Sequence, residues 1–367
     1  MSTFSRRNFL QGSTLLGISV AAAAMTPIAA AAAAPKSCRT IKEVLSMSEV
    51  DMAKNSDVVQ SAHKTIASAA NKIKDTSLRK LILSILDNPA PTIAQGNEAS
   101  ILSALKNENL IAADAKSVFP RIRNKTQSPQ PFWSAPGSGY GSHHAYPGGL
   151  ATHTALNVVS AQALYENYCL INNLELDWDD AVGGEILHDL HKPWVFQWEK
   201  DRSCRVEKTL AGTGEHHVLS IAESIKRGVK PSLVVAQACA HEHPSSKQGE
   251  ALVVGWLKAA SIIAGVDPVK RGLLASNQET LPLPRRMEGY VVHLADHDWV
   301  ISSSACQWSV QALKKLAQEQ YNISDEATFN AFRNYVLSNL TAMRLYGILS
   351  SQGPKAFAND VARVIKL

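Results

Sequence analysis

Apolar residues recur three and four positions apart along most of the chain, the spacing that places them on one face of a helix. The pattern predicts one long helix from Gly149, helices over residues 57–73, 77–86, 181–187, 215–226, 232–240, 250–264 and 288–299, and three more between residues 306 and 367. Alternating apolar and polar positions, which would indicate strands, are scarce. We therefore expect an all-α fold.

The helical periodicity stops in residues 128–149, SPQPFWSAPGSGYGSHHAYPGG, where proline, glycine and serine dominate. This composition predicts a loop, because glycine and proline break both periodicities. The segment is either a linker or a loop ordered over a site, and its aromatic residues and histidine pair favour the second. Residues 193–213 are also expected to be irregular. We divide the chain into an N-terminal helical region (35–127), a core (128–300) and C-terminal helices packed on that core (301–367).

Residues 1–34 are typical of a targeting segment. The motif SRRNFL, residues 5–10, resembles the twin-arginine export signal, and a moderately apolar, alanine-rich run follows it. The alanines at 29–34 offer cleavage sites, and an uncleaved N-terminal anchor is the alternative. With cleavage, we expect export by the twin-arginine translocase to the periplasm or the extracellular space. No other stretch is long and apolar enough to span a bilayer, so stable membrane insertion is not expected.

Charge and cysteine content exclude some classes of protein. The formal charge of +5 falls to +3 without Arg6 and Arg7, which is too mild to argue for nucleic-acid binding. The five cysteines are widely spaced, and no CxxC is present, so a dense disulfide framework is not expected. One disulfide is possible in an oxidising compartment.

Eleven of the twelve histidines lie between residues 143 and 297. With the carboxylates beside them, they form the groups His143-His144, His153, His188-Asp189 with His191, His216-His217, His241 with His243, and His293-Asp296-His297-Asp298. Imidazole and carboxylate together suit Mn, Fe, Co, Ni or Zn. His241 and His243 would be about 200° apart on a helix, so at most one of them is expected to bind a metal. The absence of HExxH argues against a zincin peptidase.

The segment HAYPGGLATHT, residues 144–154, is followed by the pair His188-Asp189, 35 positions after His153. Together they resemble the HD-domain superfamily of metal-dependent phosphohydrolases, over residues 143–300. The resemblance implies a helical bundle, with extra N- and C-terminal helices in this chain, that binds one or two divalent ions (Mn, Fe, Ni, Co or Zn). The ligands it implies are His153, His188, Asp189, His217, His241 and Asp296, with Asp189 bridging the ions. Three choices stay open: Asp298 for Asp296, His216 for His217, and His243 for His241.

The same resemblance implies that a metal-activated water hydrolyses a small phosphate ester, with Asp189 and Lys192 as catalytic residues. We expect His191 to be catalytic as well. Lys192 would contact the phosphate. His191 stands where the family commonly has glycine, and it could add a ligand, act as an acid or crowd the pocket. The aromatic residues of the loop at 128–149 suggest a nucleotide-like substrate. Two other functions stay open: an HD-fold di-iron oxygenase, and a non-catalytic metal-binding or sensing module.

Overall fold

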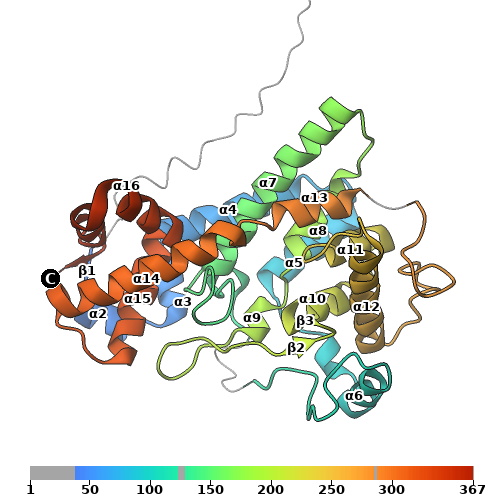
Figure 1. Cartoon of the computed structure of the whole chain (residues 1–367), viewed down its shortest axis with the longest axis horizontal. Helices are drawn as coiled ribbons and strands as arrows, with labels where there is room; N and C mark the ends of the chain where they lie inside the picture. Colours follow the sequence, from blue (N-terminus) through green and yellow to red (C-terminus); the bar gives the residue numbers. More distant parts are fainter. Residues whose placement is uncertain (1–37, 123–128, 285–286, 367) are drawn as a thin grey trace, which may run out of the picture. The chain divides into compact units, whose positions relative to one another are not determined.

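The computed structural model describes residues 38–122, 129–284 and 287–366, and the predicted export signal lies outside these ranges. Helices dominate the described residues (Figure 1). The named strands are four two-residue segments that form two small pairs. The predicted all-α fold is therefore confirmed. Among the described helices, none is long and apolar enough to cross a membrane.

The N-terminal α-helices, unlike the short 3-10 helix among them, begin at polar side chains that accept hydrogen bonds from free backbone amides. In order they are α2 (Ile41–Ser46), α3 (Glu49–Lys54), α4 (Asp57–Asn71), α5 (Thr76–Asp87), the 3-10 helix η2 (Ile93–Gln95) and α6 (Glu98–Asn107). Thr40 and Glu43 form a reciprocal capping box at α2, and Ser48 and Asp51 form another at α3. Helices α4 and α5 confirm the helices predicted over 57–73 and 77–86.

The central helices surround the histidine-rich segments. They are the 3-10 helix η3 (Phe132–Ser134), α7 (Gly149–Asn172), α8 (Trp178–Leu187), α9 (Lys192–Val195), α10 (Glu215–Lys226), α11 (Pro231–Ala238), α12 (Lys247–Ala264) and α13 (Glu288–Ala295). Helix α8 packs against α7, α11 and α13, and α10 packs against α11 and α12. The antiparallel pair β2 (Thr209–Leu210) and β3 (Thr213–Gly214) leads into α10.

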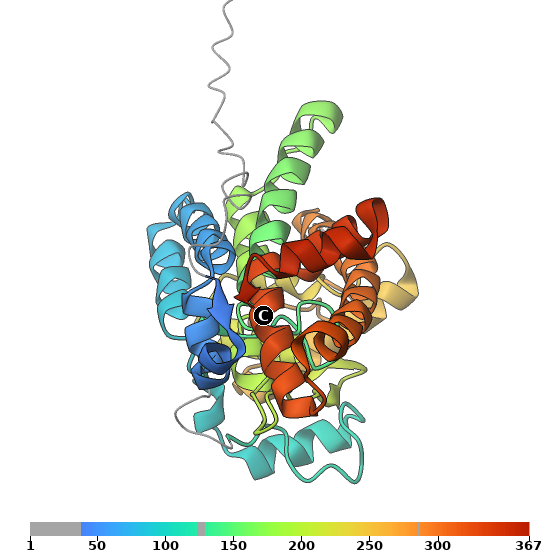
Figure 2. The same ribbon diagram turned by 90° about the vertical axis from the view of Figure 1, so that its left-hand side faces the viewer.

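The C-terminal helices are α14 (Trp299–Tyr321), α15 (Glu326–Leu340) and α16 (Ala342–Val361). Their apolar side chains form a second core, which also takes in Val44 of α2 and Met52 of α3. The parallel pair of β1 (Arg39–Thr40) and β4 (Ile365–Lys366) ties the two ends of the described chain together, as Figure 2 shows from the side of the C-terminus. The C-terminal helices therefore pack on the first helices, and α15 also contacts a central loop, where Asn334 Nδ2 donates to the carbonyl of Arg202.

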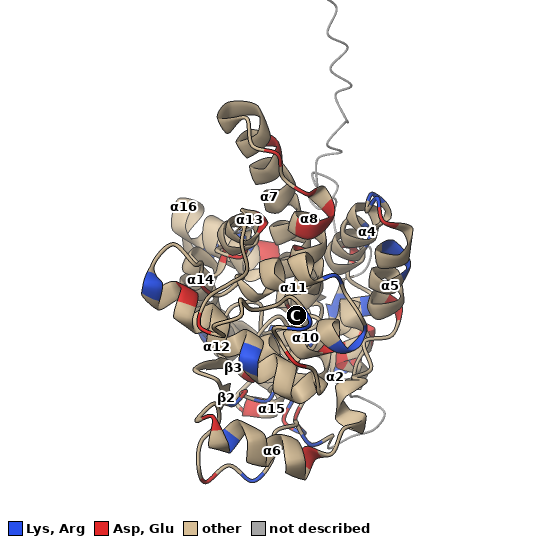
Figure 3. Ribbon diagram, turned by 90° about the vertical axis from the view of Figure 1, so that its right-hand side faces the viewer, with Lys and Arg blue, Asp and Glu red and all other residues tan. Residues whose placement is uncertain are grey.

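Charged residues of both signs are interspersed on the described helices drawn in Figure 3, without a block of one sign. All five cysteines are described and unbonded, and Cys204, Cys239 and Cys306 are buried. The possible disulfide is thus not formed in this structure.

Candidate metal centre

Five segments bring imidazoles and carboxylates to one buried point. Helix α7 carries His153 near its start, and His188 and Asp189 follow the last turn of α8. Asp296 ends α13, His216 opens α10, and His241 follows α11. These residues are buried except His241, whose side chain is 25% exposed.

The first group surrounds the Oδ2 atom of Asp189. His153 Nε2 lies 3.3 Å from it and His188 Nε2 lies 3.1 Å from it. The same two nitrogens lie 3.1 and 3.3 Å from Asp296 Oδ1. Ligand atoms held 2.0–2.1 Å from one tetrahedral ion are roughly 3.3 Å apart. The spacing of this group therefore fits a single divalent ion.

The second group uses the other oxygen of the same carboxylate. His216 Nε2 lies 3.3 Å from Asp189 Oδ1. Asp189, His216 and His241 each offer one ligand atom, and these atoms lie within 4.8 Å of one another. His241 Nε2 is also 3.9 Å from Asp296 Oδ2. Asp189 is therefore placed to bridge two ions.

The four histidines of these groups are oriented through their second ring nitrogen. His153 Nδ1 lies 3.0 Å from Asp298 Oδ1, and His188 Nδ1 donates to the carbonyl of Glu185 at 2.6 Å. His216 Nδ1 lies 2.6 Å from Glu207 Oε2, and His241 Nδ1 lies 3.1 Å from Thr213 Oγ1. An acceptor on Nδ1 fixes the tautomer that leaves the Nε2 lone pair free, as metal-binding histidines require.

Several of the converging atoms have no hydrogen-bond partner. His188 Nε2, His216 Nε2 and both carboxylate oxygens of Asp189 are buried without a hydrogen bond, although Asp189 Oδ2 has an ion pair with Lys192. Most buried polar atoms in proteins form hydrogen bonds, because a buried atom without one has lost the hydrogen bonds that water would supply. A divalent ion in each group would satisfy all four atoms at once. The donor set therefore fits one or two metal ions.

Lys192 supplies a positive charge beside the centre. Its Nζ lies 2.5 Å from Asp189 Oδ2, and its side chain is 4% exposed. Burial acts to raise the pKa of Asp189, but the charges of His188 and Lys192 hold it well below its usual range. Burial and Lys192 act to lower the pKa of His153, yet its carboxylate partners raise it to about 10. Without metal, protons and Lys192 thus balance the carboxylates.

His216, and not the predicted His217, meets Asp189. His217 Nε2 donates to the carbonyl of Ala238 at 3.2 Å, and its ring stacks on that of His241 with centroids 4.0 Å apart. Adjacent helical side chains diverge by about 100°, so only one of the pair can face Asp189. The geometry therefore favours His216 over the predicted His217 as a possible ligand.

His191 faces away from the centre, so the geometry does not support the catalytic role predicted for it. It is buried, and its Nε2 lies 3.3 Å from Glu223 Oε2. The carboxylate of Glu223 also accepts from Arg227 Nε at 2.6 Å and from the backbone amides of Thr92 and Ile93. His191 is therefore part of a buried polar cluster that links α10 to the segment before η2.

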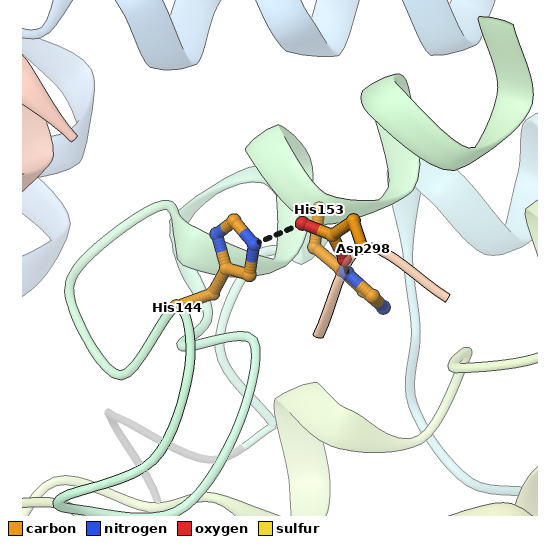
Figure 4. Close-up of side chains that lie close together, drawn as sticks. All are labelled: His144, His153 and Asp298. Atoms are coloured by element: carbon orange, nitrogen blue, oxygen red, sulfur yellow. Dashed lines mark hydrogen bonds and ion pairs between the residues drawn. The ribbon is translucent and has the colours of Figure 1, made fainter. Parts of the chain in front are cut away.

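The second His-Asp pair, His297-Asp298, contributes an orienting carboxylate. One carboxylate oxygen of Asp298 is hydrogen-bonded to His153 Nδ1. The other is hydrogen-bonded to His144 Nε2 at 2.8 Å (Figure 4). Asp296 lies in a possible metal group with His153 and His188, and Asp298 lies in another with His144 and His153. Because the first group adjoins Asp189, the geometry favours Asp296 as the ligand. His243 likewise lies away from Asp189, with its ring against that of His293, which leaves His241 in the centre.

The loop before α7 is ordered over the centre, as its composition predicts. His144 Nδ1 and Thr152 Oγ1 lie 3.1 and 2.9 Å from the hydroxyl of Tyr146. A Cβ on Gly149 would lie 1.8 Å from the carbonyl oxygen of His144, and one on Gly148, at φ +81°, would lie 2.3 Å from Val59. The two glycines therefore allow the loop to fold back so that His144 reaches Asp298.

Other residues of the centre carry weak signals in the sequence. Asn157 donates to Asp296 Oδ1 at 2.9 Å, and its position four residues after His153 could have indicated it. Glu207 lies in an irregular stretch before α10 and Thr213 lies in the two-residue strand β3, and no periodicity indicates their direction. Glu185 is fully buried beside His188, and this burial is the main reason that its pKa is raised to about 8.

Comparison with known proteins gives no further guidance on the site. No protein-family model matches the chain, and no curated protein or solved structure matches it. The assignment of the site therefore depends on its geometry and on the residues themselves.

Proposed function

We propose that this protein is an HD-type, two-metal phosphohydrolase that cleaves a small phosphate ester. The observation that carries the proposal is the position of Asp189. Its Oδ2 atom lies 3.3 and 3.1 Å from the Nε2 atoms of His153 and His188, and its Oδ1 atom lies 3.3 Å from His216 Nε2. A carboxylate shared in this way is a common device for holding two divalent ions a few ångströms apart.

Two ions held there would supply a hydroxide near neutral pH and would neutralise phosphoryl oxygens. Mn, Fe, Co, Ni and Zn all suit the imidazole and carboxylate ligands. Asp189 keeps its charge because His188 and Lys192 lower its pKa, so it is a ligand at ordinary pH. Lys192 adds a fixed cation for a phosphoryl oxygen, where negative charge develops in the transition state.

The covering loop supplies a further contact for the substrate. His143 is half-buried, and its ring centroid lies 5.6 Å from that of His153. Burial, and then the charge of Lys192, lowers its pKa to about 2, so it is a neutral imidazole. We assign it the role of hydrogen-bonding the substrate. Phe132 and Tyr146 of the same loop are fully buried, so they do not support the nucleotide-like substrate that the loop composition suggests.

Lys192→Met separates this function from metal binding alone. The variant should keep its metal content while phosphate release from a panel of esters falls by about 100-fold, the size typical of losing one transition-state charge contact. Phosphate release unchanged in the variant, or absent from the metal-loaded wild type with every ester, would argue against a phosphohydrolase.

The ligand set also suits a second candidate, an HD-fold di-iron oxygenase. The four histidines and two aspartates of the centre are the donors that such a site uses. Oxygen-dependent turnover of an organic substrate by the iron-loaded protein, together with no phosphate release, would favour it.

We further propose that the chain is exported to the periplasm by the twin-arginine translocase. The support is the SRRNFL motif and the alanine-rich run that follows it. This route carries folded proteins, so the buried centre could be filled in the cytosol. Replacing Arg6 and Arg7 with lysine should retain the protein, with its metal, in the cytosol. Continued export of this variant would contradict the route.

A further inference from the structure

Arg333 of α15 is a buried cation outside the metal centre. Its side chain is 1% exposed. Nη1 donates to the side-chain oxygen of Asn334 at 3.0 Å, and the guanidinium lies 4.9 Å from the centre of the Tyr140 ring. Its Nε and Nη2 atoms have no nitrogen or oxygen partner, and the Cys306 thiol lies beside the guanidinium. Among the described residues, no ion pair to a carboxylate is found for it.

The groups around Arg333 do not balance its charge. Glu326 is engaged by Lys314 Nζ and by the hydroxyl of Tyr140, each at 3.2 Å. Burial raises the pKa of the Cys306 thiol more than Arg333 lowers it, so this neighbour stays neutral. Because a buried charge without a counter-ion is strongly unfavourable, the site lacks an anion.

A cavity of about 220 Å³ adjoins this guanidinium, between α14 and the loop that carries Tyr140. Arg333 and Cys306 form its buried end. Gly141, Gln307 and Gln311 line it at exposed positions, so the cavity can be reached from solvent. A water molecule takes about 30 Å³. The space therefore admits a small polyatomic ion with some of its waters.

The free donors of Arg333 indicate the shape of the missing ion. Nε and Nη2 form one edge of the planar guanidinium, and this edge matches two oxygens of a carboxylate or phosphate. Gln307 and Gln311 are four residues apart on α14, so both amides lie on one face of the helix beside the cavity.

We propose that this cavity is a binding site for a small oxyanion, with Arg333 as its counter-ion. The site does not depend on the proposed phosphohydrolase function, because it shares no residue with the metal centre. Tyr140 nevertheless belongs to the same loop as His144, which contacts Asp298 at that centre.

Calorimetry on the metal-free, full-length mature chain tests the proposal. Metal is removed so that no metal ion competes with Arg333 for the added phosphate. Inorganic phosphate and acetate are titrated separately, which shows whether a phosphate or a carboxylate is preferred. The wild type should bind at least one of them. Arg333→Met should weaken that binding at least tenfold, and so should Val310→Phe, which narrows the cavity but keeps the charge.

Thermal unfolding gives a second readout. Without anion, Arg333→Met should melt at or above the wild-type temperature, because it removes an uncompensated buried charge. The preferred anion should raise the melting temperature of the wild type alone. Arg344→Met is the matched control: Arg344 is paired with Asp360 through two 2.8 Å bonds, so this variant should melt lower and bind the anion normally. No binding to the wild type, or equal binding to Arg333→Met, would overturn the proposal.

Discussion

Replacing the adjacent histidines of α10 one at a time tests which of them binds metal at the centre. His216→Gln removes the imidazole that faces Asp189, and His217→Gln removes its neighbour one position along the chain. The two variants change the same residue type at the same level of burial. Any difference between them therefore reports which side chain belongs to the centre.

The contacts give the expected sizes. Without His216, the second group keeps only Asp189 Oδ1 and His241, and Glu207 loses its 2.6 Å partner. Loss of an orienting partner alone typically weakens metal binding 10- to 100-fold, so loss of a ligand should weaken the second ion by at least about 100-fold. His217→Gln instead removes one hydrogen bond to Ala238 and the stacking on His241, a stability loss of about 1–3 kcal/mol.

Metal content by mass spectrometry and stability by thermal unfolding read out both effects. Wild type and His217→Gln should each retain two ions per chain after gel filtration, while His216→Gln should retain one. A lower melting temperature is expected for His217→Gln. Loss of an ion from His217→Gln with full occupancy in His216→Gln would refute the assignment.

Three further predictions follow from the surroundings of the centre. Asp298→Asn should lower metal affinity by about 10- to 100-fold in a chelator-competition assay, because Asp298 orients His153 through Nδ1; unchanged affinity would contradict this role. His191→Gln should reduce stability by about 1–3 kcal/mol in denaturant unfolding and leave metal content unchanged, since His191 faces Glu223; a variant that loses metal would place His191 in the centre after all. Metal affinity should rise with pH up to about 10, because His153 is protonated below its raised pKa in the metal-free protein and must release that proton to bind; calorimetry in buffers of different ionisation enthalpy would detect the proton, and no proton release at pH 8 would refute this explanation.

The same raised pKa changes stability in the absence of metal. A histidine with pKa about 10 in the folded state stabilises the fold fully below the unfolded value of about 6.5, and this contribution is lost as pH rises toward 10. The metal-free protein should therefore lose the contribution of His153 over the range in which metal binding becomes stronger.

The sequence predicted the elements of the centre better than the direction of their side chains. The apolar periodicity located α7, α8, α10 and α13, and with them the helices that carry His153 and His216. It could not choose between His216 and His217, because that choice depends on how α10 is rotated against α8. The same uncertainty applied to His191, which lies two positions beyond Asp189 and faces Glu223 instead.

Long-range partners were beyond the reach of local patterns. Glu207 orients His216 from an irregular segment, and Asp298 orients His153 from 145 positions away. The second core, which joins α2 and α3 to α14–α16, likewise depends on tertiary packing. Composition did predict the ordered loop, of which the structure describes residues 129–149: Phe132 is buried in the core and Gly148 packs against Val59.

Anomalous scattering from crystals of the protein matured in the cytosol is the most direct test of the central claim that Asp189 bridges two metal ions. Two peaks about 3.5–4 Å apart are expected, one beside His153 and His188 and the other beside His216 and His241. If the crystallised protein contains metal but shows no peak at Asp189, or shows metal only at the outlying His243 and His293, the account is contradicted.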